Sequence, residues 1–596
     1  MNAVSPVETL VTDHLDLWTA ALKRKSTAGR GSSSKVELYG IKKLRELILE
    51  LAVRGLLVPQ DPNDEPASEL LRKIAAEKAR LVKEGKIRKD KPLPVIDEKE
   101  TPFTLPSNWT FARWGEIAEW AIGSGFPTEA QGENDQEILF SKVSDMNLLG
   151  NEKYIVTTVN SISRKTAEKI KAKAHPPGTV VFPKIGGAIA TNKRRILVRE
   201  TAIDNNCLGL IPGDGITTDY LYLLLSSVDL SAYQSGTSVP ALSQGNLELI
   251  IAGLPPLSEQ HRIVSKVDEL MALCDQLEQE TDASLGAHQT LVETLLSALT
   301  SAADHAQFAS AWQRIAGHFD TLFTTEESIA QLKQTLLQLA VMGKLVPQDP
   351  NDEPASELLK KIAAEKAKLV KEGKIKKEKP LPLVGEDETL FSLPLGWAWC
   401  RLENVSLHSE AGWSPKCEEV PRVGSCWGVL KVSAVTWGVF NPAENKALPA
   451  NLDAAPDCEV KPGDFLISRA NTAELVARSV VVQNDAPPRL MMSDKIIRFS
   501  FSKEVCAAYL SLFNNSSGSR KYYLRVAGGT SSSMKNVSRL QIQSLAVALP
   551  PLAEQHRIVA KVDELMALCD QLKSRLSDAQ TTQLHLADAL VERAIG

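Results

Sequence analysis

The sequence lacks the long apolar runs and cysteine pairs that mark membrane, exported or zinc-binding proteins. None of its apolar runs approaches the ~20 residues that a helix needs to cross a bilayer. The first residues, up to Trp18, are acidic and contain no basic segment followed by an apolar core, so we expect no export signal. The eight cysteines form no CxxC pair and no zinc-like spacing with histidine. Scattered thiols are typical of a reducing compartment, and we expect a cytoplasmic protein with no membrane partner.

Motifs for ATP hydrolysis and methyl transfer are also missing. The chain has no GxxxxGK[ST] phosphate loop and no Asn-Pro-Pro-aromatic motif of an adenine methyltransferase. The segment 456–461 imitates a PD…ExK nuclease pattern, but such a site needs carboxylates from separate strands around a metal, whereas Asp457 and Glu459 are two apart. His261 and His556 have no nucleophile beside them and are expected to make packing or polar contacts at helix starts. We therefore expect no catalytic residue, metal or cofactor in this chain.

What the chain does contain is a tandem repeat. Residues 51–94 and 339–382 are identical at 38 of 44 positions, and residues 254–277 and 549–572 at 22 of 24. The two stretches that these repeats enclose share almost no run of identical residues. A recent duplication explains the flanks, but uniform drift would have blurred flanks and enclosed stretches alike. The contrast favours flanks that do one job twice and inserts that do two different jobs.

The second repeat has the signature of a long helix. Pro256 ends the preceding segment, and Ser258 can act as an N-cap ahead of Glu259. Apolar residues then recur at heptad spacing and continue more weakly for about 38 residues, roughly 57 Å at 1.5 Å per residue. Because this stripe outlasts an ordinary globular helix, we expect the two copies to pair antiparallel about a pseudo-twofold axis. The pairing residues are Ile263, Val267, Leu270, Cys274 and Leu277 in the first copy, and Ile558, Val562, Leu565, Cys569 and Leu572 in the second.

The first repeat predicts a second, shorter helix. Asp64 is expected to cap it, Pro66 to lie in its first turn and Gly85 to end it, and a basic tail follows at 86–92. A charge run is usually a solvated face, and that interpretation stays open. The same exposed surface displayed twice nevertheless suggests one kind of partner that docks twice.

The inserts change from helical periodicity to short strand-like runs punctuated by Gly, Pro, Ser and Asn. A common skeleton can still be traced through both of them, so we expect two domains of one fold with different surfaces. The matched segments are 140–145 with 429–434, 177–184 with 462–469, and 236–238 with 529–531.

Local charge in the inserts favours nucleic acid, although the net charge of the whole chain is −5. Residues 164–200 hold ten Lys or Arg against two acids, and residues 505–553 hold five with no acid. Basic groups supply phosphate affinity, and Ser, Thr, Asn and Arg can donate to base edges. The candidate DNA contacts are Ser141, Lys142, Lys184, Lys193, Arg194, Arg195, Thr237 and Ser238 in the first insert, and Lys431, Ser433, Ser468, Arg469, Asn471, Thr472, Thr530, Ser531 and Lys535 in the second. We expect the cluster 193–195 to hold phosphates, and Lys184 and Arg469 to enter a groove.

Taken together, these features resemble the specificity subunits of type I restriction-modification systems. The resemblance rests on the order insert, PPLxEQHRIV helix, insert, PPLxEQHRIV helix, and on 427–433 and 463–472, which are similar to stretches of that family's target-recognition domains. It covers residues 36–596, and the long repeats resemble the type IB subgroup; residues 1–35 have no counterpart.

The resemblance implies a non-catalytic subunit whose two target-recognition domains read the halves of a split site in double-stranded DNA, with the helices setting the gap. It also implies two methyltransferase subunits as partners, and restriction (motor) subunits in the full complex of this phage-defence system. S-adenosylmethionine, ATP and Mg are expected in those partners.

The expected fold is α+β, with two target-recognition domains of mixed α/β build separated by two long antiparallel coiled-coil helices in a pseudo-twofold tandem repeat. Those two domains are expected at 104–256 and 392–550. The remaining segments are an N-terminal helical region at 1–103, a central helical spacer at 257–391 and a C-terminal spacer helix at 551–596. The alternative is a coiled-coil scaffold that joins protein partners without reading DNA. It predicts no sequence preference and leaves both basic inserts unexplained.

Overall fold

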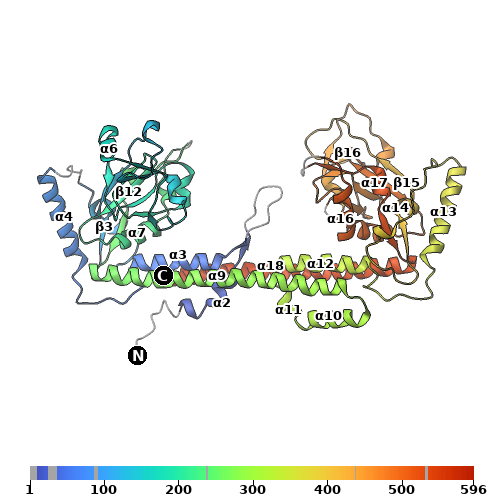
Figure 1. Ribbon diagram of the computed structural model, residues 1–596, viewed down its shortest axis with the longest axis horizontal. Helices are drawn as coiled ribbons and strands as arrows, with labels where there is room; N and C mark the ends of the chain where they lie inside the picture. The colour runs from blue at the N-terminus through green and yellow to red at the C-terminus, as the bar shows by residue number, and fades with distance from the viewer. Residues whose placement is uncertain are drawn as a thin grey trace. The chain divides into compact units, whose positions relative to one another are not determined.

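The computed structural model describes residues 10–24, 36–85, 92–236, 239–436, 438–529 and 534–595. The chain divides into two compact units, Met1–Ser284 with Ala579–Gly596, and Leu285–Asp578. Each unit contains one sheet-rich insert and a set of helices (Figure 1). No helix in the described ranges has the length and apolar character needed to cross a membrane.

Three helices form the helical core of the first unit: α3 (Tyr39–Arg54), the beginning of α9 (Leu257–Ser301) and the end of α18 (Leu552–Ile595). Apolar side chains of α3 recur at helical spacing and are buried with the stripe of α9 and with Ala587. Polar contacts between α3 and α9 show how the two helices run relative to each other. Gln60, just after α3, bonds Glu259 at the start of α9, and Arg45 bonds Asp275 further along, so α3 and α9 are antiparallel.

The tail of α18 runs parallel to α3 in this unit. Tyr39 Oη donates to Asp588 (2.7 Å), and Arg54 donates to the carbonyl of Ile595 (3.2 Å). The tail is therefore antiparallel to α9, as the sequence predicts for the two long helices.

The second unit repeats this arrangement with α12 (Glu326–Val341), the beginning of α18 and the end of α9. Gln348 bonds Glu554, and Glu326 pairs with Lys573 at 3.6 Å, so α12 and α18 are antiparallel. Gln331 donates to Glu293 of α9 (3.0 Å), and two further helices, α10 (His305–Gly317) and α11 (Phe319–Leu322), join α9 to α12.

All ten predicted pairing residues lie in apolar cores, but the expected pair of helices is in fact part of a three-helix group in each unit. The apolar stripes of α3 and α12 would otherwise face water, and burying each Leu or Ile contributes about 1.5–3 kcal/mol. The first-copy residues are buried in the first unit: Ile263, Val267, Leu270, Cys274 and Leu277. In the second unit Ile558, Val562 and Cys569 are buried, and Leu565 and Leu572 are half-buried.

The first insert contains two main sheets. The five-stranded sheet has the order β4 (Ala118–Ile122), β12 (Cys207–Pro212), β9 (Val180–Pro183), β10 (Arg195–Leu197) and β6 (Tyr154–Ile155). The four-stranded sheet has the order β7 (Asn160–Ile162), β5 (Ile138–Ser141), β11 (Thr201–Ile203) and β8 (Ala174–His175). A short pair, β3 (Thr110–Arg113) with β13 (Ile251–Leu254), closes the insert. Its helices are α5 (Trp114–Ile117), α6 (Arg164–Ile170), α7 (Thr218–Ser227) and α8 (Gln244–Leu247).

The second insert is built in the same way. Its four-stranded sheet has the order β15 (Ser406–Ala411), β22 (Ile496–Phe501), β18 (Phe465–Ser468) and β20 (Ser479–Val481). A three-stranded sheet has the order β17 (Asn445–Ala447), β16 (Gly428–Leu430) and β21 (Leu490–Met491). The closing pair is β14 (Ala398–Arg401) with β24 (Ala546–Leu549), and a further pair is β19 (Ala470–Asn471) with β23 (Lys535–Asn536). The helices are α14 (Leu402–Val405), α15 (Ala507–Asn515), α16 (Ser517–Val526) and α17 (Arg539–Gln543).

Strand registers confirm that the two inserts share one skeleton. Pro183 of β9 lies opposite Cys207 of β12, and Ser468 of β18 lies opposite Ile496 of β22. The residues after β9 and β18, Lys184 and Arg469, are therefore equivalent, as the matched sequence segments predict.

Buried polar side chains at the start of each long helix bond the backbone of its insert; we call these contacts, centred on Gln260 and Gln555, the joints. Gln260 is fully buried; its side chain accepts from the backbone N–H of Thr217 (2.9 Å) and donates to the carbonyl of Gly215 (3.1 Å). Gln555 accepts in the same way from the N–H of Cys506 (2.8 Å). The neighbouring carboxyl, Glu259, accepts from Gln60 (2.6 Å), and its burial raises its pKa.

The joint also corrects three sequence predictions. Asp64 does not cap α4 (Ala67–Lys83), because its carboxylate bonds Arg262 at 2.6 Å, and Ser258 lies inside α9 rather than before it. His261 is exposed, which excludes a packing contact, and a polar contact stays a prediction for it. The prediction that Gly85 follows the end of α4 is confirmed, with a φ of +69° that favours glycine.

Candidate nucleic-acid interface

Three segments of the second insert meet beyond the end of β18. Arg469 donates its backbone N–H to the carbonyl of Lys495 (2.9 Å), and its own carbonyl accepts from the N–H of Val537 (2.9 Å). The pair β19–β23 then places Asn471 opposite Lys535. This junction brings together Arg469, Asn471, Lys495 and Lys535, which we call the second cluster.

The first insert forms the same junction. Lys184 donates its N–H to the carbonyl of Asn206 (2.7 Å), and its carbonyl accepts from the N–H of Leu242 (2.9 Å). The bridge of Ile185 with Ala241 corresponds to the β19–β23 pair. We call Lys184, Asn205 and Asn206 the first cluster, and both asparagines are exposed.

Side chains of the second cluster are held in part by their own backbone. Lys535 donates to the carbonyl of Gly529 (2.6 Å). Asn471 donates to the hydroxyl of Thr436 (3.2 Å) and accepts from the N–H of Thr472 (2.8 Å), so Thr472 supports Asn471 through its backbone. Arg469 is half-buried, and Lys495 is exposed. The predicted contacts Thr237, Ser238, Thr530 and Ser531 lie outside the described residues.

The structure contradicts the prediction that Arg194 holds a phosphate. Its side chain is only 3% exposed and donates to the carbonyls of Leu225 (3.1 Å) and Val228 (3.2 Å), and to Asn192 (2.7 Å). The guanidinium also lies 5.5 Å from the ring centre of Phe182, and burial lowers its pKa to about 10. Arg194 therefore fastens the end of α7 to the sheet.

The side chains of Lys193 and Arg195, on either side of Arg194, also form hydrogen bonds within the insert. Arg195 donates to the carbonyls of Arg194 (2.7 Å) and Met146 (2.8 Å), and burial lowers its pKa. Lys193 bonds the side chain of Asn147. The densest basic run of the first insert is thus mostly structural: Arg194 supplies donors to the carbonyls at the end of α7, and its two neighbours bond other groups of the insert.

Two serines that the sequence predicts as DNA contacts are buried, so they too are removed from the candidate interface. Ser141 in β5 and Ser468 in β18 are both fully buried. The hydroxyl of Ser468 accepts from the N–H of Arg478 (3.2 Å) and donates to the carbonyl of Leu475 (3.2 Å). Neither serine can reach a base edge without leaving its sheet.

The remaining candidates, Lys142, Lys431 and Ser433, follow the equivalent strands β5 and β16. Lys142 donates to Gln131 (2.7 Å) and lies 5.1 Å from the ring centre of Phe126. Lys431 lies 3.6 Å from Glu444, which also accepts from Ser433. Glu444 partly neutralises Lys431, and Lys142 is already held by an amide and an aromatic ring, so both are weaker candidates than the two clusters.

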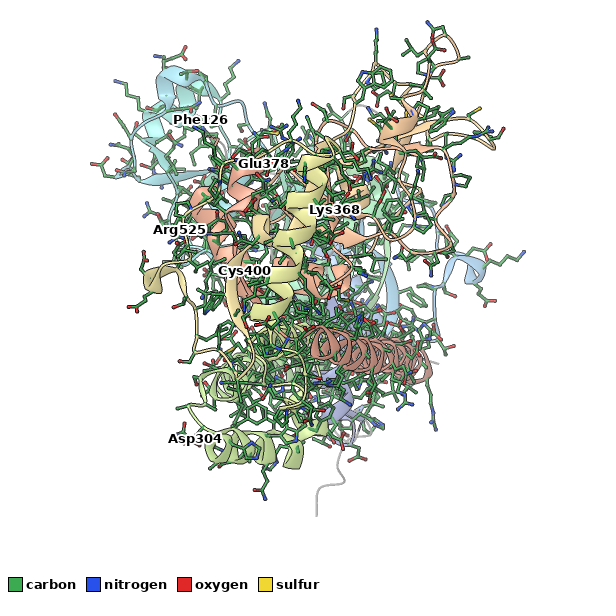
Figure 2. The ribbon with its side chains drawn as sticks, turned by 90° about the vertical axis from the view of Figure 1, so that its right-hand side faces the viewer. Phe126, Asp304, Lys368, Glu378, Cys400 and Arg525 are labelled. Carbon is green, nitrogen blue, oxygen red and sulfur yellow. The ribbon has the colours of Figure 1, made fainter. Side chains whose placement is uncertain are left out.

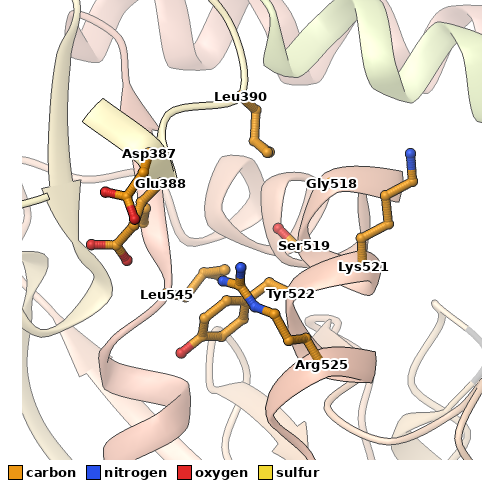
Figure 3. Close-up of a pocket in the computed structure, with 10 residues that line it drawn as sticks. Asp387, Glu388, Leu390, Gly518, Ser519, Lys521, Tyr522, Arg525 and Leu545 are labelled. Atoms are coloured by element: carbon orange, nitrogen blue, oxygen red, sulfur yellow. The ribbon is translucent and has the colours of Figure 1, made fainter. Parts of the chain in front are cut away.

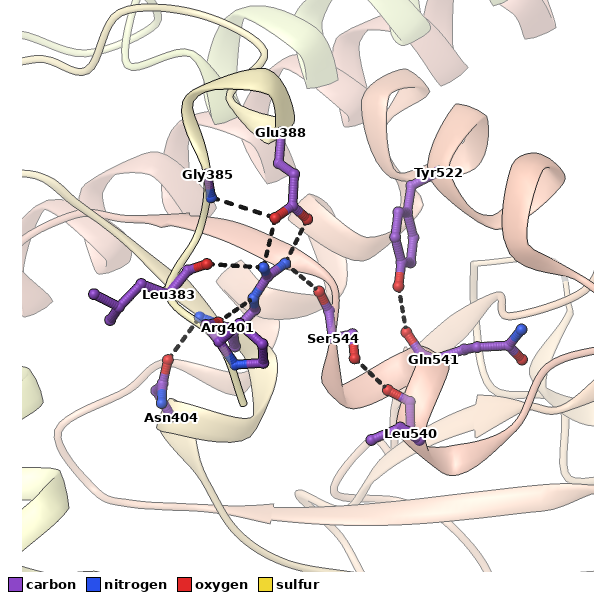
Figure 4. Close-up of polar contacts among 10 residues, drawn as sticks. Leu383, Gly385, Glu388, Arg401, Asn404, Tyr522, Leu540, Gln541 and Ser544 are labelled. Atoms are coloured by element: carbon purple, nitrogen blue, oxygen red, sulfur yellow. Dashed lines mark hydrogen bonds and ion pairs between the residues drawn. The ribbon is translucent and has the colours of Figure 1, made fainter. Parts of the chain in front are cut away.

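A pocket on the second insert is a different kind of site (Figure 3). It is lined by acidic and basic residues together, among them Asp387, Glu388, Lys521 and Arg525. Glu388 is held by two 2.6 Å contacts to Arg401, which also donates to the carbonyl of Ser544 (2.9 Å) (Figure 4). Those hydrogen bonds hold the pKa of Glu388 below its ordinary value and raise that of Arg401.

The first unit contains an equivalent of the Arg401–Glu388 contact, and we call each such contact a strap. Its presence in both units indicates a structural role. Arg113 donates to Glu100 (3.0 Å) and to the carbonyl of Leu249 (2.7 Å). Each strap ties the segment after the repeat helix to the base of its insert. Because the pocket carries a carboxylate already bound to Arg401, we do not assign it to phosphate binding.

Sequence comparison gives close relatives of the whole chain. Residues 106–286 match the family model described as the type I restriction modification DNA specificity domain. The chain is 45% identical to the type I restriction enzyme EcoEI specificity subunit of Escherichia coli, covering 99% of this chain and 100% of that protein. It is 42% identical to the EcoAI specificity subunit of the same organism, with the same coverage.

A structure comparison finds a more distant match. The HsdS subunit from Thermoanaerobacter tengcongensis aligns with a TM-score of 0.42 at 17% identity, covering 83% of this chain and 98% of that chain.

Proposed function

The chain belongs to the family of type I restriction enzyme specificity subunits, and from this premise we propose how it reads DNA. The protein is a DNA-specificity subunit without catalytic activity of its own. Each insert is a target-recognition domain, at 104–256 and 392–550, and each reads one half of a split double-stranded site. The type IB subgroup remains a prediction.

One observation carries this proposal: the same three-segment junction occurs in both inserts with different side chains. The first cluster presents Lys184 with two exposed asparagines, and the second presents Arg469 with Lys495 and Lys535. A common backbone with exchanged polar side chains is what two readers of different base sequences need. A scaffold that only joins proteins would not need it.

The repeated flanks supply the surface for partner subunits in this proposal. Helices α4 and α13 (Ala355–Lys371) carry the same charges at every exposed position, with Arg72 and Arg80 replaced by lysine at 360 and 368. Lys368 lies on the exposed side of α13 (Figure 2). Two methyltransferase subunits, with restriction subunits in the full complex, would bind S-adenosylmethionine, ATP and Mg, and the assembly would act in the cytoplasm.

The proposal is tested by exchanging one insert. Residues 392–548 are replaced with the second insert of a relative, and the full chain is expressed with its partner subunits in a host that lacks other such systems. Mapping of methylated adenines should show that only one half of the bipartite motif has changed. A change in both halves, or in neither, would contradict independent target-recognition domains.

A further inference from the structure

An exposed carboxylate, that of Asp494, lies beside the second cluster. Asp494 directly precedes Lys495, whose carbonyl accepts the N–H of Arg469. Its carboxylate accepts from the hydroxyl of Ser414, and its backbone N–H donates back to the same hydroxyl at 3.0 Å. Trp413, next to Ser414, donates its N–H to the carbonyl of Met492 (2.9 Å). Two loops therefore hold Asp494 in a fixed position.

Asp494 forms no ion pair with the cations around it in the described part of the chain. Lys495 follows Asp494 directly in the sequence, and in the described residues no ion pair joins the Asp494 carboxylate to Lys495 or to Arg469. Its hydroxyl partner engages one carboxylate oxygen, Oδ1. The position therefore keeps a negative charge and an acceptor available next to the exposed Lys495.

The first insert places a different acceptor at the equivalent position. Asn206 and Lys495 are equivalent, because their carbonyls accept from Lys184 and Arg469, and so Asn205 matches Asp494. Ser124 donates its N–H to the carbonyl of Ile203 (2.8 Å), as Trp413 does to Met492.

The partner of Ser414 in this alignment is Gly125. The amide nitrogen of Asn205 lies 3.8 Å from where a Cβ on Gly125 would stand. The same two loops therefore meet in both inserts, with an amide in one and a carboxylate in the other.

A carboxylate at a DNA-binding surface repels phosphates, so it needs a hydrogen-bond donor to be useful there. Among the groups exposed in the major groove, only the exocyclic amino groups of cytosine and adenine donate. An Asn side chain can both accept from adenine N6 and donate to its N7. We propose that Asp494 and Asn205 are specificity-determining residues, an inference that rests on the proposed function and refines it. Asp494 accepts from an exocyclic amino group in the half-site of the second insert, and Asn205 contacts the corresponding base of the other half-site.

The test measures binding of the full chain, assembled with its methyltransferase subunits, to the cognate duplex and to duplexes with each base pair replaced in turn. For the wild-type protein, replacing the amino-bearing base should weaken binding about tenfold. Asp494→Ala should lose that dependence at one position of the second half-site and keep it everywhere else. The position at which the dependence disappears identifies cytosine or adenine. On unrelated duplexes the variant should bind as well as the wild type or more tightly, because a repulsive charge is gone.

Two controls keep the outcome specific. Asp485→Ala removes an exposed carboxylate in the same insert, beyond β20 at the end of the sheet opposite Arg469, and should leave every duplex unchanged. Ser414→Ala removes the hydroxyl that positions Asp494 but keeps the carboxylate, and should lower the same base dependence only in part.

Several results would overturn the proposal. Unchanged discrimination by Asp494→Ala, or an equal loss on cognate and unrelated duplexes, would show that the carboxylate does not read a base. Asn205→Ala must in turn alter the first half-site alone. If the wild-type complex showed no preference among duplexes, the proposed function itself would fail, which is a distinct result.

Discussion

The joints and the clusters use polar side chains in opposite ways. In the joints, Gln260 and Gln555 are fully buried, and their amide groups bond backbone of the same chain. In the clusters, the side chains of Asn205 and Lys495 are exposed, and their positions are set by backbone hydrogen bonds instead. A residue whose partners are internal cannot be exchanged without leaving a buried group unpaired. A residue whose partner is another molecule can change when that molecule changes, which explains why the flanks stayed alike and the inserts diverged.

Removing one buried joint residue should have the largest effect on stability. Gln555→Ala leaves the N–H of Cys506 and the carbonyl of Pro550 without their partner, so we expect a loss of about 2–4 kcal/mol in the free energy of unfolding. Chemical denaturation measures it. The adjacent His556 is exposed, and His556→Ala should cost less than about 0.5 kcal/mol. Equal effects of the two substitutions would contradict the assignment of the joint.

Arg194 tests whether a basic residue inside an insert can have a structural role, with all of its partners in the same chain. Arg194→Ala removes the donor to the carbonyls of Leu225 and Val228, and should lower the free energy of unfolding by about 2–3 kcal/mol. The folded variant should keep its preference for the cognate duplex. A variant of unchanged stability that binds all DNA more weakly would restore the phosphate role that the sequence suggested.

Arg469 should show the opposite pattern. Arg469→Ala should weaken binding to the correct half-site by about 1–3 kcal/mol and leave the free energy of unfolding within about 0.5 kcal/mol. Affinity is measured against salt on cognate and scrambled duplexes. If the loss is the same on both duplexes, Arg469 contacts phosphate rather than a base.

The smallest expected effect concerns pH and the strap of the second unit. Arg401 holds the pKa of Glu388 below its ordinary value, so the carboxylate contributes stability above that value and loses it as the pH falls through its lowered pKa. Glu388→Gln should cost about 0.5–1 kcal/mol at pH 7, after solvent screening is considered. The difference from the wild type should shrink below pH 4.5, the ordinary value for this group. A gap that stays constant down to pH 3 would mean that the pair does not stabilise the fold through its charge.

The sequence predicts the long helices and the shared insert skeleton well, because both leave periodic or repeated patterns. It does not predict the third helix of each group, since the stripe of α3 is short enough to belong to any local core. It misplaces Arg194, because only the fold brings the carbonyls at the end of α7 to that guanidinium. The sequence does not single out the proposed readers Asn205 and Asp494, since isolated exposed polar residues carry no pattern; their equivalence depends on the backbone hydrogen bonds before β12 and β22.

Ala587 and its neighbours near the carboxyl terminus complete the apolar core of the first unit. During synthesis on the ribosome, the stripes of α3 and α9 are therefore made long before the segment that covers them. The stretch 285–578 must be translated first, and at ordinary elongation rates this takes tens of seconds. The nascent first unit thus exposes part of its apolar surface to water for that time, until the last helix emerges and covers it.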